Sequence, residues 1–134
     1  MTQEDKELLL KDICARLPYG VKGIRIYKPE EIVTLGKIIP RCKMNPNIGN
    51  SSFCELGFDK ISDCCTITEF KPYLFPLFSM TEEQEKEYND LNCYELGCFP
   101  YTEDALDYLI KNHFDFRCLI PKGLAIDATG LNIY

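Results

Sequence analysis

The sequence contains none of the short motifs that mark common active sites. It has no G-x-G-x-x-G or Walker loop for phosphates, no H-E-x-x-H for zinc and no G-x-S-x-G for a nucleophilic serine. A calcium loop needs acidic residues at alternating positions around a central glycine, and no segment fits that pattern. We therefore expect no catalytic residue, no cofactor and no metal, and we expect that the protein is not an enzyme.

Long apolar runs are also absent. No stretch reaches the ~18 consecutive apolar residues that a membrane span needs. The first ten residues, MTQEDKELLL, are acidic and do not resemble a signal peptide or a transit peptide. We expect a cytoplasmic protein that does not bind membranes.

Basic residues are few and scattered. The chain has 15 Lys and Arg against 21 Asp and Glu, which gives a formal net charge of −6 at pH 7. Binding to a phosphate backbone needs a clustered basic face, so the sequence argues against a nucleic-acid partner. Solubility explains the charge best. A basic protein partner and mimicry of nucleic acid are the sharper alternatives.

Paired cysteine spacing is missing although the chain has 8 cysteines. No C-x-x-C occurs, and CYELGC places two thiols five residues apart, which is poor spacing for zinc. Disulfides are not expected in reducing cytoplasm. We expect reduced cysteines without metal, most of them packed as small buried hydrophobic residues. The eight are Cys14, Cys42, Cys54, Cys64, Cys65, Cys93, Cys98 and Cys118.

The composition is that of a globular protein. Hydrophobic residues make up 46% and charged residues 27% of 134 residues. This length predicts one domain over residues 1–134, and a chain of this size folds without a disulfide or a metal.

Three segments have the spacing of helices. The first begins after Thr2 and ends at LPYG, where proline and glycine stop it. Within it, Asp12 and Arg16 form an i,i+4 pair that we expect to contribute a few tenths of a kcal/mol. Thr81 and Gln84 form a capping box for a second helix, on the surface. Thr102 caps the third helix. The apolar stripes of the first and third helices are Leu9, Leu10, Ile13, Cys14 and Leu17, and Ala105, Leu106, Leu109 and Ile110.

Several segments have the pattern of strands. GVKGIRIY, IVTLGKII, FCELGF, SDCCTITEF and CYELGCF are expected strands, KPEE is an expected turn, and 41–52 is an expected flexible loop. Pro72 and Pro76 argue against a central strand, so 71–80 is expected to be an apolar connection. The order α-β-β-β-β-α-β-α predicts an α+β fold. Its sheet is mostly antiparallel, with four to five strands and helices packed on one face.

The stretch IKNHFDFRC holds the only histidine, His113, and ends at Cys118. We interpret His113 as a structural residue whose ring meets free carbonyls at the end of the third helix. Asp115 and Arg117 would then form a surface ion pair worth under ~1 kcal/mol. The alternative is a thiol nucleophile at Cys118 with His113 as its base.

Three stretches, the last of which contains IKNHFDFRC, resemble a known family: MTQEDKELLLKDICARLPYGV, KPYLFPLFSMTEEQEKEY and DYLIKNHFDFRCLIPKGLAIDA. They are similar to short proteins that gut Bacteroidales bacteria and their phages carry, often in several versions. The likeness covers about half of the chain. The chain departs from it at Phe75, Tyr108 and Cys118, where the family has arginine, tryptophan and glycine. The family has no assigned activity, so the resemblance implies a bacterial or phage cytoplasmic setting and supplies no catalytic residue.

Three functions follow in order of preference. The first is a non-catalytic protein-binding module of phage or mobile-element type that modulates a host protein. The alternative is a protein that binds or sequesters a small ligand, a nucleotide-like signal, with Arg25, Lys22 and Arg117 as candidate contacts. The third is the thiol enzyme built on Cys118 and His113. The sequence leaves the oligomeric state open.

Overall fold

The computed structural model describes residues 1–40, 54–61, 64–91 and 102–134. Its helices are α1 (Gln3–Arg16), α2 (Glu82–Leu91) and α3 (Glu103–Lys111), with short 3₁₀ turns η1 (Leu17–Tyr19), η2 (Ile67–Glu69) and η3 (Leu77–Ser79). Its strands are β1 (Lys22–Arg25), β2 (Lys28–Pro40), β3 (Cys54–Phe58), β4 (Cys64–Thr66), β5 (Phe70–Pro76), β6 (Phe114–Asp115) and β7 (Ile126–Asp127).

All three helices begin at the predicted caps. Thr2 accepts a hydrogen bond from the backbone N–H of Asp5, whose carboxylate accepts one from Thr2 in return. Thr81 and Gln84 make the equivalent box before α2, and the Thr102 hydroxyl accepts from Ala105 before α3. These boxes satisfy N–H groups that the first turn of a helix leaves free.

The described strands form one sheet in the order β4-β3-β2-β1-β5-β6, and β7 also pairs with β5. The pairings from β4 to β5 are antiparallel, whereas β6 and β7 run parallel to β5. The expected α+β class is confirmed. With seven strands, the sheet is larger than the four to five expected and partly parallel. The strand expected in CYELGCF and the loop expected at 41–52 lie outside the described residues.

The segment 71–80 is not the connection that its prolines predicted. Residues Phe70–Pro76 form β5, which lies inside the sheet between β1 and β6. Pro76 is the last residue of the strand, and Pro72 precedes the residues that pair with β7. The prolines, which have no backbone N–H, therefore lie where β5 makes few hydrogen bonds to its neighbouring strands. On β1, the residue opposite Pro72 is Gly23. A Cβ added to Gly23 would lie 2.4 Å from the Lys71 carbonyl oxygen, so this position has no room for a side chain.

Two further expectations about strands were wrong. The turn expected at KPEE falls at residues 26–27, so KPEE is the start of β2. SDCCTITEF is not one strand, because a further capping box, between Thr66 and Glu69, begins η2 after the short β4. The T-x-x-E spacing of a capping box was present in the sequence and could have predicted this break.

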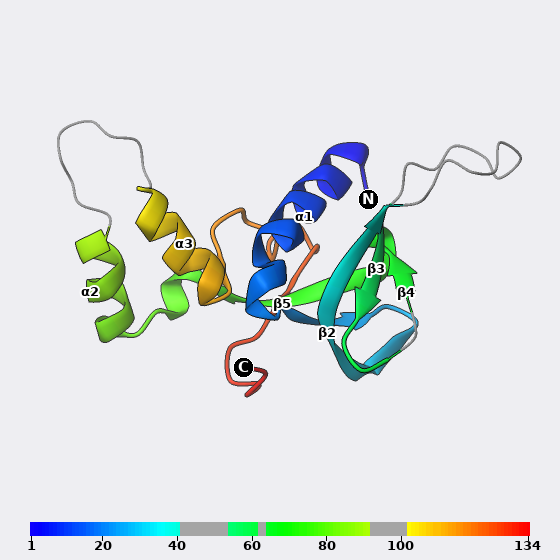
Figure 1. Ribbon diagram of the computed structural model, residues 1–134. Helices are drawn as coiled ribbons and strands as arrows, with labels where there is room; N and C mark the ends of the chain where they lie inside the picture. Colours follow the sequence, from blue (N-terminus) through cyan, green and yellow to red (C-terminus); the bar gives the residue numbers. More distant parts are fainter. Residues whose placement is uncertain (41–53, 62–63, 92–101) are drawn as a thin grey trace, which may run out of the picture.

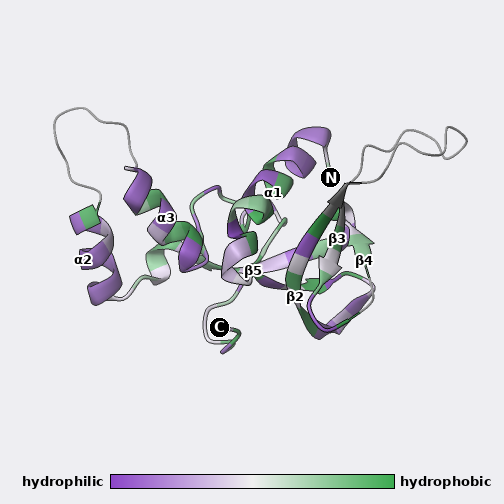
Figure 2. Ribbon diagram, in the orientation of Figure 1, coloured by the Kyte–Doolittle hydropathy of each residue, from purple (hydrophilic) through white to green (hydrophobic). Residues whose placement is uncertain are grey.

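The elements are arranged along one direction (Figure 1). β2, β3 and β4 lie at one end, α2 and α3 at the other, and α1 lies above β5 between them. Apolar residues of α1, β2, β3 and β5 pack together in one buried cluster, and Figure 2 shows apolar stretches in these elements. The main buried cluster includes Leu9, Ile13, Val21, Leu35, Leu56, Phe70, Leu74 and Leu119. None of the helices described here is long and apolar enough to cross a membrane.

Candidate functional site

His113 is the second residue after α3, and its backbone has the left-handed conformation that ends many helices, with φ 62°. Its N–H donates to the Ile110 carbonyl, at 3.1 Å. The ring is 7% exposed and stacks on Tyr134, with 3.8 Å between ring centroids and 12° between planes. His113 is therefore anchored by a ring stack to the C-terminal segment.

The electrostatics keep the His113 ring neutral. Burial, helped by the positive charges of Arg16 and Lys22, lowers its pKa to about 4. Its Nδ1 atom is buried and has no hydrogen-bond partner among the described residues. The sequence predicted that the ring meets free carbonyls at the helix end, and Nδ1 makes no such bond. The stack on Tyr134 takes its place.

Cys118 is exposed and has the left-handed backbone conformation, with φ 58°. Within the described part of the chain, no hydrogen bond or ring contact joins Cys118 to His113. The described structure does not assemble the nucleophile–base contact that a thiol mechanism needs.

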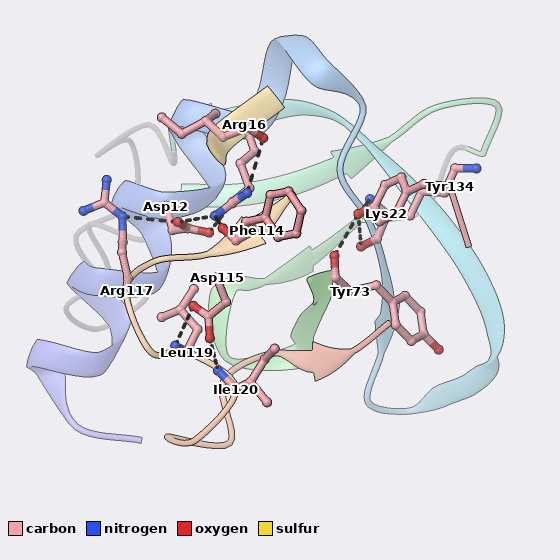
Figure 3. Close-up of polar contacts among 11 residues, drawn as sticks. Asp12, Arg16, Lys22, Tyr73, Phe114, Asp115, Arg117, Leu119, Ile120 and Tyr134 are labelled. Carbon is pink, nitrogen blue, oxygen red and sulfur yellow. Dashed lines mark hydrogen bonds and ion pairs between the residues drawn. The ribbon is translucent and has the colours of Figure 1, made fainter. Parts of the chain in front are cut away.

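Asp115 and Arg117 do not form the expected surface pair. Asp115 is buried, and its carboxylate accepts hydrogen bonds from the backbone N–H groups of Leu119 and Ile120, at 2.9 and 2.8 Å (Figure 3). Its role is to hold the turn that follows β6. Arg117 instead reaches Asp12 on α1, at 3.2 Å.

Asp12 and Arg16 form the expected pair, but in the core rather than at the surface. Their side chains are 1% and 0% exposed, and the Arg16 Nε lies 2.7 Å from an Asp12 carboxylate oxygen. The guanidinium also donates to the carbonyls of Ile110 and Phe114, at 3.3 and 2.7 Å. This cluster, with Arg117 as a second cation, ties α1 to α3 and β6 (Figure 3).

The three basic residues considered for a small ligand do not meet in one site. Arg25 is buried and pairs with Glu31. The Lys22 ammonium donates to the Ile133 carbonyl at 3.0 Å, and Arg117 is held by Asp12. Each cation has its own structural partner.

A cleft of about 410 Å³ opens instead beside His113, between η3, α2, the end of α3 and the C-terminal residues. Its volume lies within the range of small-molecule sites. It is lined by Phe75, Ser79, Gln84, Lys111, Asn112, His113, Phe114 and Tyr134. Only His113 among these was considered as a site residue from the sequence. Lys111, Asn112 and Phe114 are its neighbours in the chain, whereas the other lining residues come from distant segments and carry no local signal for a binding site.

A second surface feature lies next to the cleft. Phe78, in η3, is 90% exposed, and Leu77 beside it is also exposed. We call these two residues the η3 knob. The helix that follows, α2, has no buried residue and carries five acidic residues and one lysine. Figure 2 shows α2 as almost wholly hydrophilic.

The described cysteines differ from the expectation of small buried residues. Cys14, Cys64 and Cys118 are exposed, and Cys65 is buried. Cys42, Cys93, Cys98 and the side chain of Cys54 lie outside what the structure describes. Among the residues that the structure describes, no three of His, Cys, Asp and Glu come together as a metal site.

No family model, curated protein or solved structure matches this chain.

Proposed function

We propose that the protein is a non-catalytic protein-binding module that modulates a host protein, and that the η3 knob is the centre of its binding surface. The phage or mobile-element origin in this proposal comes from the family resemblance. The partner is a protein with an apolar pocket surrounded by basic side chains.

The observation that carries the proposal is the exposure of Phe78. A single exposed aliphatic residue is ordinary on a protein surface, but a phenylalanine 90% exposed leaves nearly its whole ring in water. Aromatic side chains that enter a partner's pocket supply much of the binding free energy of many interfaces. The side chain of Leu77 extends the apolar surface beside it.

The chemistry of the partner follows from α2. Glu82, Glu83 and Glu85 lie in its first turn, which begins four residues after Phe78 of the η3 knob. Charged groups around an apolar contact select a partner of opposite charge and speed its approach. The knob supplies affinity, and the acidic helix selects a basic partner surface.

The test is an affinity capture from a Bacteroidales lysate, with the captured proteins identified by mass spectrometry and then purified for binding measurements. We expect the wild-type chain to retain a protein that Phe78→Ser loses, with affinity reduced roughly 30-fold or more, as for a central interface residue. Glu83→Lys should weaken binding and reduce its dependence on salt.

Ile32→Ser is the matched control, because Ile32 is also a large exposed apolar residue but lies on β2, away from the η3 knob. It should leave the affinity unchanged. A partner that binds Phe78→Ser as tightly as wild type, or that Ile32→Ser weakens equally, would contradict the proposal.

A further inference from the structure

We propose that the cleft beside His113 is a second binding site, for a small planar heterocycle that carries one phosphate, such as a nucleoside monophosphate. This inference is independent of the proposed protein partner, because it rests on the cleft and not on the η3 knob.

Aromatic rings make up half of the lining. Phe75 lies with its ring centroid 6.1 Å from that of Phe114 and 5.9 Å from that of Tyr134, and Tyr134 stacks on His113. Phe75 is half-buried and Tyr134 is 42% exposed, so these two rings are the ones that a ligand can reach. Such faces bind the flat ring of a heterocycle by stacking, at about 1–3 kcal/mol per base in nucleic-acid complexes.

Two amides supply hydrogen bonds for the edge of the ring. The Gln84 side-chain oxygen accepts from the backbone of Thr81 at 3.0 Å, which leaves its NH₂ group as a donor. The Asn112 NH₂ group donates to the Tyr108 carbonyl at 2.9 Å, which leaves its oxygen as an acceptor. One donor and one acceptor beside aromatic faces match the polar edge of a nucleobase.

The charge of the lining favours an anion. Lys111 is the one charged side chain among the described residues that line the cleft, and no Asp or Glu is among those residues. The histidine ring adds polarity without charge at neutral pH. Lys111 is exposed at the rim, so a phosphate can bind it while the ring enters the cleft.

His113 also makes the site testable. It is the only histidine in the chain, so its ring gives a single set of NMR signals. We expect adenosine, guanosine or uridine 5′-monophosphate to shift these signals, with saturation below about 1 mM. Ribose 5-phosphate, which lacks the base, and adenosine, which lacks the phosphate, should each bind at least about 10-fold more weakly.

Variants of the protein distinguish binding of the phosphate from binding of the base. Lys111→Met should weaken nucleotide binding about 5- to 10-fold and leave adenosine binding unchanged. Lys86→Met removes an exposed lysine on α2 that does not line the cleft, and it should have no effect. Gln84→Glu keeps an oxygen for the helix cap but replaces the donor, so it should weaken binding of the base.

Phe78→Ser should leave nucleotide binding unchanged, which keeps this test separate from that of the protein partner. The proposal is overturned if none of the three nucleotides shifts the His113 NMR signals at about 10 mM, 10-fold above the expected saturation. It is also overturned if ribose 5-phosphate binds as well as the nucleotides, or if Lys86→Met acts like Lys111→Met.

Discussion

At the scale of single residues, His113 combines a left-handed backbone with a buried neutral ring. The backbone conformation is needed to end α3 and to turn the chain into β6. The neutral ring is a consequence of where that turn places it, next to Tyr134 and near two cations. Helix-end position and burial act on the pKa in opposite directions, and in this structure burial is the larger effect.

We predict that acid destabilises the fold through His113. The ring has a pKa of about 4 in the folded chain and an ordinary value of 6.5, so between these values the unfolded chain binds more protons. The free energy of unfolding should therefore fall as the pH falls from 6.5 towards 4, by on the order of 2 kcal/mol. NMR titration of the ring and chemical unfolding at several pH values measure both quantities.

His113→Asn is the suitable comparison, because asparagine adopts positive φ more readily than most residues and cannot titrate. Its free energy of unfolding should fall less than that of the wild type between pH 6.5 and 4. At pH 7, His113→Ala should be less stable than both the wild type and His113→Asn. A ring that titrates near 6.5 in the folded protein would contradict this account.

At the scale of elements, α1 is held to α3 and β6 by a buried charge cluster as well as by apolar packing. Asp12 is the single anion of that cluster, facing Arg16 and Arg117. A buried pair adds little net stability over an apolar one, but removing one member leaves the other charge without compensation.

Asp12→Asn should therefore lower the free energy of unfolding by about 3–5 kcal/mol, although it changes the side chain very little. Glu7→Gln is the control on the same helix, since Glu7 is exposed, and it should change stability by less than about 0.5 kcal/mol. Urea unfolding of the three proteins checks the prediction. Equal midpoints for Asp12→Asn and Glu7→Gln would mean that the cluster is open to water.

The elements that could be predicted are those with local signals. Thr2, Thr81 and Thr102 begin their helices because a cap depends on residues within one turn. The strand β5 could not be predicted, because the effect of Pro72 depends on which neighbour its missing N–H faces. The burial of Asp12 was equally hidden, since its second cation comes from position 117.

At the scale of the whole molecule, the candidate sites were the least predictable part. The cleft joins Phe75, Gln84, His113 and Tyr134, which are far apart in the sequence. The only one of them with a sequence signal for a functional site was His113, the single histidine of the chain. The exposure of Phe78 was hidden too, because an apolar run is the same in sequence whether it is buried or not.

The distribution of the cysteines gives a prediction for the molecule as a whole. In the folded protein, Cys14, Cys64 and Cys118 should react with a thiol reagent much faster than Cys65, which is 4% exposed. Timed labelling with peptide mass spectrometry measures this, with urea-unfolded protein as the reference for full reaction. Cys118 should label at the same rate in His113→Asn. A rate that depends on His113 would restore the thiol-enzyme hypothesis.

The position of β5 has a consequence for how the protein is made. Ribosomes release a chain from its N-terminus, so β1 and β2, which are close in sequence, can pair early. The parallel partners of β5 are β6 and β7, and β7 begins at Ile126. During synthesis one side of β5 therefore stays unpaired until the ribosome has made the chain as far as β6 and β7. In that interval the nascent chain exposes a strand edge that chaperones can bind and that neighbouring chains can pair with.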